Sequence, residues 1–286
     1  MLSVQSAAAL SYAPATPAAA QATRSSVRMA NTAAELETLA KELNPSVGYF
    51  DPLGVGTLAK KIDADEQATI GWWRHAEIKH GRVAMAAFVG FCVQSNGICF
   101  PWALQGGAFG GQTINFADIS AAGGPGDQWD ALPTMAKLQI IGAVGILEAI
   151  GELSPVIEAN GEKHYVKGGK PGYYPPFAGF FNEKYWPHPL PLNLWDPFGF
   201  TKKMTPERKA KALRAEINNG RLAQIGIFGM ISASKGLSIP GLDSIEGIKP
   251  YAGEYMAPFA ASDNLPFVAD MLAGAPQFGN MVPNLY

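Results

Sequence analysis

The chain has 286 residues, of which 48% are hydrophobic and only 16% are charged. This composition excludes a disordered protein, because disordered chains are poor in apolar residues and rich in charge. The 22 Lys and Arg residues against 24 Asp and Glu give a net charge of −2. No basic field would therefore attract nucleic acid. Two cysteines exclude a disulfide framework and a multi-cysteine metal cluster. The mean hydropathy of +0.03 leaves a globular helical protein, or a membrane protein with polar groups in its spans.

Residues 1–30 are rich in Ala and Ser, and their only charges are Arg24 and Arg28. Basic, Ser-rich and acid-poor segments of this kind are typical of organelle transit peptides. We predict a plastid transit peptide that is removed near Met29, with a disordered tail as the alternative. Residues 31–286 then form the mature domain.

Three segments predict helices, at about 70–93, 133–153 and 206–234. Their uncharged centres cover residues 83–93, 138–147 and 222–234. A membrane helix needs about 20 predominantly apolar residues, and shorter runs are more typical of buried core helices. Hydropathy alone therefore favours a soluble bundle.

The loops argue for a membrane protein, because residues 94–136 contain no Lys or Arg, whereas the next connection is rich in both. Positive residues mark one side of a membrane. This asymmetry fits three crossings, and aromatic residues that suit a membrane interface lie near the helix ends: Trp72, Trp73, Trp129 and Trp195. We predict an all-α membrane protein with three transmembrane helices, with an unevenly charged soluble protein as the alternative.

The first and third helices form an internal repeat with a constant offset of 139 residues. Residues 76–84 read AEIKHGRVA, and residues 215–223 read AEINNGRLA. A turn precedes each copy, Asp51-Pro52 before the first and Asp196-Pro197 before the third. Each copy is therefore a turn, a spacer and a helix. We predict that the two helices cross with pseudo-two-fold symmetry.

Glu77 and Arg82 are five residues apart, so they point about 140° from each other and do not pair within the helix. An unpaired charge inside a membrane costs about 3 kcal/mol. The repeat offers reciprocal partners, Glu77 with Arg221 and Glu216 with Arg82. We expect small residues to allow close approach of the two backbones, namely Gly81, Gly90, Gly220, Gly226, Gly229, Ala84 and Ala223.

Glu77 and His80 share a helix face, as do Glu216 and Asn219. Three interpretations stay open. A di-iron bundle would use Glu-x-x-His on two helices, but the second copy has Asn219, and a fourth helix is missing. Independent single-ligand sites would suit chlorophyll magnesium, which needs one axial oxygen or nitrogen ligand. A helix-locking set of ion pairs without any metal is the third.

The motifs Glu77-x-x-His80-x-Arg82 and Glu216-x-x-Asn219-x-Arg221 resemble the signature of the light-harvesting chlorophyll-binding family. The resemblance covers about residues 45–260. Gln224, the spacing from Gln139 to Glu148, and residues 164–172 resemble the chlorophyll a/c branch of red-lineage algae, that is, the fucoxanthin and peridinin proteins. Residues 164–172 together with 250–254 look most like dinoflagellate or related antenna proteins.

The resemblance implies a set of axial ligands to chlorophyll magnesium: Glu77, His80, Glu148, Glu216 and Asn219, with Gln139 and Gln224 as further candidates. It implies that Arg82 and Arg221 complete the crossed ion pairs. The resemblance implies a further chlorophyll site late in the third helix, where related proteins often have a His or Gln ligand. This chain has Ala233 at that position, so the occupancy of this chlorophyll site is in question. His164 and His188 are expected at the surface. Cys92 and Cys99 are expected as free thiols, with a disulfide as the alternative.

The resemblance further implies chlorophyll a, chlorophyll c and a carotenoid (fucoxanthin, peridinin or a related xanthophyll), with carotenoid head groups near the two Asp-Pro turns. The connection 154–205 is expected to cover pigment or a neighbouring subunit. The implied location is the chloroplast thylakoid membrane. The implied partners are a photosystem core, other antenna subunits and thylakoid lipid. The expected function is light harvesting without enzymatic chemistry. Photoprotective quenching and a pigment-free membrane scaffold are the alternatives.

Overall fold

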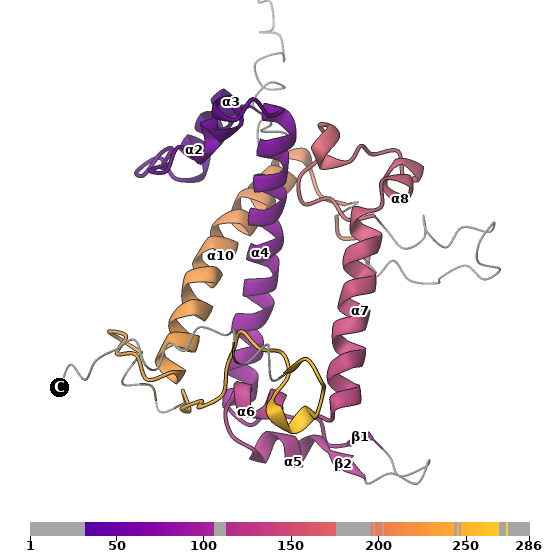
Figure 1. Cartoon of the computed structure of the whole chain (residues 1–286). Helices are drawn as coiled ribbons and strands as arrows, with labels where there is room; N and C mark the ends of the chain where they lie inside the picture. Colours follow the sequence, from indigo (N-terminus) through magenta and orange to yellow (C-terminus); the bar gives the residue numbers. More distant parts are fainter. Residues whose placement is uncertain are drawn as a thin grey trace, which may run out of the picture.

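The computed structural model of the chain describes residues 32–105, 113–175, 196, 198–201, 203–242, 245, 247–268 and 273. Its helices are α2 (Ala33–Leu43), α3 (Leu58–Lys61), α4 (Glu66–Ser95), α5 (Phe116–Ala121), α6 (Pro125–Asp130), α7 (Thr134–Glu152), α8 (Ser154–Ala159) and α10 (Pro206–Ser234). Short 3-10 helices are η1 (Val55–Thr57), η3 (Tyr165–Lys167) and η4 (Ala261–Asp263). Strands β1 (Ala103–Gln105) and β2 (Ile114–Asn115) form one antiparallel pair. The described chain is therefore predominantly helical (Figure 1).

The long helices α4, α7 and α10 lie where the sequence predicts helices, and α4 extends the expected range 70–93 at both ends. Asp65 caps the start of α4 by accepting from Gln67 N, and Thr205 caps α10 by accepting from Arg208 N. These side chains satisfy backbone donors that have no partner within the helix. Gly97 and Gly236 follow the two helices with positive φ, at 68° and 83°. At such angles a residue with a side chain would be strained.

Helices α4 and α10 pack against each other and come closest at two glycines (Figure 1). A Cβ atom added to Gly220 would lie 2.9 Å from Gly81 Cα, and one added to Gly81 would lie 3.0 Å from Gly220 Cα. The expectation for Gly90 is wrong, because nothing lies within 4 Å of an added Cβ there. Gly226 and Gly229 face side chains, those of Phe88 and Leu242, instead of the opposite backbone. Close backbone approach is thus confined to the middle of the repeat.

Helix α7 stands apart from this pair along most of its length (Figure 1). Every residue from 138 to 149 is exposed, so the apolar surface of α7 is open on all sides. Among the described residues, α7 is the one helix that is long and apolar enough by composition to span a membrane. Of its most apolar stretch of 18 residues, 17% is buried. A helix that is apolar all round is normally surrounded by protein or lipid.

Small packing units cover both ends of the long helices. At the N-terminal end of α4, Leu39 and Leu43 of α2 form a cluster with Ile217 of α10. At the other end lie the strand pair, α5, α6 and the returning segment 247–268 (Figure 1). Buried Lys137, with 0% exposure, pairs there with Asp263 at 2.7 Å between Nζ and Oδ2. This contact ties the returning segment to the first turn of α7.

Candidate functional site

The centre of the α4–α10 interface contains the two reciprocal ion pairs that the repeat predicts. Arg82 Nε lies 2.6 Å from Glu216 Oε1, and Arg221 Nε lies 2.7 Å from Glu77 Oε1. Each pair joins α4 to α10, since no pair forms within a copy of the motif. The prediction of reciprocal pairing is confirmed. The pairs flank the contact between Gly81 and Gly220.

The two reciprocal ion pairs differ in the further contacts of their side chains, and the sequence did not lead us to expect these contacts. Arg74 Nη1 donates to Glu77 Oε2 at 3.1 Å, so both oxygens of Glu77 accept from guanidinium groups. Arg82 Nη1 donates to the carbonyl oxygen of Gly172 at 2.7 Å, which fixes the segment after η3 against α4. The signal for Arg74 was available in the sequence, because it lies three residues before Glu77 on the same helix face.

His80 and Asn219 occupy equivalent positions in the two copies, and both are exposed. His80 Nδ1 lies 2.8 Å from the carbonyl oxygen of Ala76. A ring nitrogen beside a carbonyl oxygen must donate, so Nδ1 carries a proton, and in the neutral ring the lone pair is on Nε2. The Nε2 atom of His80 can therefore act as an axial ligand. The exposed amide of Asn219 offers its oxygen in the same way.

Glu148 on α7 has a counter-ion on another helix, because Lys79 Nζ of α4 lies 2.6 Å from Glu148 Oε2. Lys79 also reaches Glu152 at 3.0 Å. Glu152 in turn accepts from the Tyr165 hydroxyl at 2.7 Å. This network joins the C-terminal end of α7 to α4 and η3. Burial, followed by the hydrogen bond to Glu152, raises the pKa of the Tyr165 hydroxyl above its usual value.

The prediction that His164 lies at the surface is wrong. His164 is buried, with its ring packed 4.3 Å from that of Tyr165 between centroids. His75, also buried, stacks on the same Tyr165 ring, at 4.1 Å between centroids, and its Nδ1 accepts from the amide of Gly172. The Glu152 carboxylate lies 3.3 Å from His75 Nε2 and 3.5 Å from His164 Nε2. Both histidines thus belong to the packing of residues 163–172 against α4.

The two glutamine candidates lie in different surroundings. Gln139 is exposed on α7, and Gln224 is half-buried on α10 beside Gly81. The structure places Gln224 near the reciprocal ion pairs and leaves Gln139 on the open surface of α7. Among the described residues, no three His, Cys, Asp or Glu side chains gather as a shared metal site would require.

The two Asp-Pro turns have the same hydrogen-bond pattern. Asp51 accepts from the amides of Val55 and Gly56, both at 2.8 Å. Asp196 accepts from the amides of Phe200 and Thr201, at 2.7 and 3.0 Å. The glycine three residues after each aspartate has positive φ, 65° and 66°. The Gly56 amide is the main reason why the pKa of the Asp51 carboxyl is below its usual range. The repeat therefore includes the turns as well as the helices.

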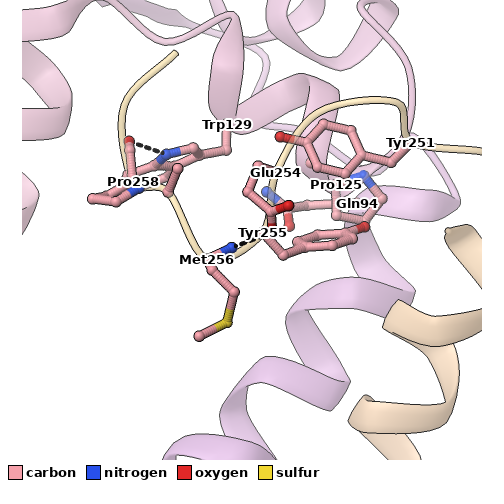
Figure 2. Close-up of a pocket in the computed structure, with 10 residues that line it drawn as sticks. Gln94, Pro125, Trp129, Tyr251, Glu254, Tyr255, Met256 and Pro258 are labelled. Carbon is pink, nitrogen blue, oxygen red and sulfur yellow. Dashed lines mark hydrogen bonds between the residues drawn. The ribbon is translucent and has the colours of Figure 1, made fainter. Parts of the chain in front are cut away.

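Two cavities lie at the C-terminal ends of α4 and α10. The larger, about 440 Å³, is shown in Figure 2, where Trp129, Tyr251 and Tyr255 surround it and Gln94 lies at the end of α4. The Trp129 indole donates to the carbonyl oxygen of Pro258 at 2.8 Å, which fixes this wall. The smaller, about 300 Å³, lies beside Ala233 and is lined mainly by aliphatic side chains. Among the described residues, the lining of the smaller cavity includes no His or Gln side chain, so it offers neither of the two ligand types considered for the position of Ala233.

Cys92 and Cys99 are free thiols. The predicted leader (residues 1–30), His188, Trp195 and Pro197 lie outside the described residues, as does much of the connection 154–205.

Comparison with known proteins places this arrangement in a family. The family model described as chlorophyll A-B binding protein matches residues 35–235. A fucoxanthin-chlorophyll a-c binding protein of Trieres chinensis is 35% identical over 199 residues, which is 68% of this chain and 78% of the relative. Two proteins of the same description from Phaeodactylum tricornutum are 30% identical over 80% of this chain and 91% of the relative, and 31% identical over 82% and 95%.

The family match and these relatives therefore define the class of protein as the light-harvesting antenna proteins, which are not enzymes. The chain belongs to the chlorophyll-binding light-harvesting family, and its relatives are of the chlorophyll a/c type of red-lineage algae. The resemblance stated from the two Glu-containing motifs is confirmed. The comparisons bring no support for the quenching or scaffold alternatives.

Proposed function

We propose that this chain spans the thylakoid membrane three times, through α4, α7 and α10, and holds chlorophylls at single-ligand sites on the outer faces of these helices. The observation that supports this most is the reciprocal ion pairing, which neutralises both ligand carboxylates inside the helix pair. A protonated His or an unpaired carboxylate would not suit an apolar membrane interior. A neutralised carboxylate can enter it.

Helix lengths support the three spans. At 1.5 Å per residue, the 30 residues of α4 and 29 of α10 extend about 45 Å, against a hydrocarbon core of about 30 Å. The charges of both helices concentrate in their N-terminal halves, whereas the C-terminal halves expose large apolar side chains such as Val89 and Phe228, at 61% and 74%. Helix α7 exposes apolar side chains on every face. Lipid and flat aromatic pigments would cover these surfaces.

We assign the magnesium ligands as the sequence predicts: Glu77, His80, Glu148, Glu216, Asn219, Gln139 and Gln224. His80 supports the assignment, since its proton is held on Nδ1 by Ala76 and its Nε2 atom is open. Glu216 supports it as well, since Oε1 accepts from Arg82 and Oε2 has no donor among the described residues. The ligated magnesium would fix each pigment ring at a set distance from its neighbours, so that excitation energy passes between them.

The identity of the pigments is inferred from the relatives, whose names describe them as fucoxanthin-chlorophyll a-c binding proteins. We propose chlorophyll a, chlorophyll c and a fucoxanthin-type carotenoid for this chain. The matched turns at Asp51 and Asp196 have equivalent hydrogen bonds to the backbone four and five residues on. They would receive carotenoid head groups. A photosystem core would receive the excitation energy.

Refolding the mature chain with plastid pigments tests the proposal. The refolded protein is expected to show chlorophyll Soret and red absorption bands and energy transfer from carotenoid to chlorophyll. E216A should retain fewer chlorophylls per polypeptide, and T205A, which alters only the cap of α10, serves as the control. An identical pigment content in wild type and E216A would contradict the ligand assignment.

A further inference from the structure

The repeat is not symmetric at its two carboxylates. Glu77 accepts at Oε1 from Arg221 at 2.7 Å and at Oε2 from Arg74 at 3.1 Å. Glu216 accepts at Oε1 from Arg82 at 2.6 Å. No described residue donates to Glu216 Oε2. One carboxylate therefore faces two guanidinium groups, and its counterpart faces one.

The difference arises from a single position. Arg74 precedes Glu77 by three residues, and the repeat offset of 139 places Leu213 at the equivalent position before Glu216. Arg74 is 5% exposed, so water does not solvate its charge. Its Nε atom is buried without a hydrogen-bond partner among the described residues. Glu77 is thus the acceptor on which this buried cation depends, because an unpaired buried charge is strongly destabilising.

We propose that Arg74 makes the two magnesium sites unequal, so that Glu77 binds its chlorophyll more weakly than Glu216 does. This inference rests on the proposed function of both carboxylates as axial ligands. Magnesium is a hard cation that prefers an anionic oxygen with available electron density. At Glu216 that oxygen is Oε2. At Glu77 the equivalent oxygen already accepts a charge-assisted hydrogen bond, which must weaken or be shared when magnesium binds.

Electrostatics act in the same direction. Arg74 and Arg221 place two positive charges beside the single negative charge of Glu77. At the other site, the one positive charge of Arg82 faces the one negative charge of Glu216. The excess positive charge repels a magnesium ion that carries partial positive charge, and the low dielectric of the helix pair strengthens this effect. Arg74 is therefore a tuning residue, since it acts on magnesium through the ligand carboxylate.

The substitution R74L copies the residue at the equivalent position of the third helix. It removes a buried cation and leaves Glu77 paired with Arg221. The affinity of the Glu77 chlorophyll should accordingly rise about tenfold, because 1.4 kcal/mol corresponds to that factor. R74K, which keeps the cation, serves as the matched control and should raise the affinity little.

The measurement is a titration of refolded protein with chlorophyll, followed by pigment extraction and absorption difference spectra. E77A and E216A identify the spectral contribution of each site. The proposal predicts that R74L raises occupancy at the Glu77 site and leaves the Glu216 site unchanged. Equal occupancy of the Glu77 site in wild type and R74L would overturn it, and so would loss of that chlorophyll in R74L.

A different result would contradict the proposed function itself: E77A and E216A would each retain the full number of chlorophylls. If R74L does not refold, R74Q replaces it. Its neutral amide is a weaker donor than guanidinium. A rise in occupancy smaller than tenfold would then support the proposal, and no rise would contradict it.

Discussion

At the scale of single residues, the two ion pairs give each motif carboxylate a counter-ion on the other helix. Glu216 faces Arg82 of the other helix at 2.6 Å, and its own motif arginine, Arg221, pairs with Glu77. Each carboxylate is therefore neutralised across the interface. The same contacts hold the two helices together, so the proposed pigment ligation and the helix pairing would depend on the same atoms.

Substitution R82A should reduce both helix pairing and pigment content. It leaves Glu216 without its cation, which costs about 3 kcal/mol in a membrane, and it releases the carbonyl oxygen of Gly172. We expect a lower yield of refolded protein with fewer chlorophylls, measured by pigment extraction. R82K should preserve more pigment, because it retains the charge. Unchanged chlorophyll content in R82A would show that the crossed pairs are not needed for ligation.

Substitution H80A should remove a chlorophyll and leave the helix pair intact. The His80 ring contacts the protein through a hydrogen bond to its own helix, at Ala76, and takes no part in the ion pairs. Thermal unfolding of the pigment-free protein in detergent should therefore match that of wild type, whereas pigment extraction should show one chlorophyll fewer. A normal pigment content would exclude His80 as a ligand.

At the scale of elements, the α4–α10 contact depends on two glycines and not on a long stripe of small residues. Gly81 and Gly220 approach within van der Waals distance of each other's backbone, whereas Gly90 faces open space. Most residues in 83–93 and 222–234 are exposed or half-buried. Their exposed side chains include Val89 and Phe228.

Substitution G220A should separate the helices, because its Cβ would lie 2.9 Å from Gly81 Cα. A clash with backbone cannot be relieved by a rotamer change, so the interface must open and lengthen the ion pairs. We expect a destabilisation of about 1–3 kcal/mol, read as a lower thermal transition. G90A is the matched control and should leave stability unchanged, or raise it slightly through helix propensity. Equal transitions in the two variants would contradict the contact.

The elements with regular patterns could be predicted from sequence, and those that depend on distant contacts could not. The repeat predicted the partners of Glu77 and Glu216, because an i,i+5 spacing excludes pairing within one helix. The capping box at Thr32 and Glu35 that begins α2 was a local signal that went unused. The buried position of His164 depends on Tyr165 and Glu152. No local pattern around His164 indicates such contacts.

At the scale of the whole molecule, the segment 247–268 returns across the ends of three helices. Tyr251 N donates to the carbonyl oxygen of Ser234 at 2.8 Å, and the Tyr251 hydroxyl donates to Asp130 at 2.9 Å. Lys235 Nζ donates to the carbonyl oxygen of Gly253 at 2.6 Å. This segment therefore connects α10 to α6 at the side of the protein that is poor in positive charge. It compensates for the sparse contacts of α7 with the other long helices.

The Lys137–Asp263 pair should control how firmly this segment is attached. Lys137 is 0% exposed, and Asp263 also accepts from Thr134 Oγ1 at 2.7 Å and from Ala260 N at 2.9 Å. K137M would leave a buried carboxylate without its cation, at a cost of about 3–5 kcal/mol. The double variant K137M/D263L removes both charges and should recover much of that stability. Limited proteolysis within residues 247–268 measures the attachment, and equal cleavage of wild type and K137M would contradict the role of the pair.

The same pair predicts how attachment depends on pH. Burial raises the pKa of the Asp263 carboxyl, but the hydrogen bonds from Lys137, Thr134 and Ala260 outweigh it, so the pKa lies below its usual value of 3.8. A carboxyl whose pKa is lowered by folding contributes stability above its unfolded pKa, about 4, and loses it as pH falls through the folded pKa. The segment should therefore stay protected from proteolysis from pH 7 to pH 5, and become sensitive only below about pH 4. A midpoint of detachment near pH 6 would show that a different group controls this contact.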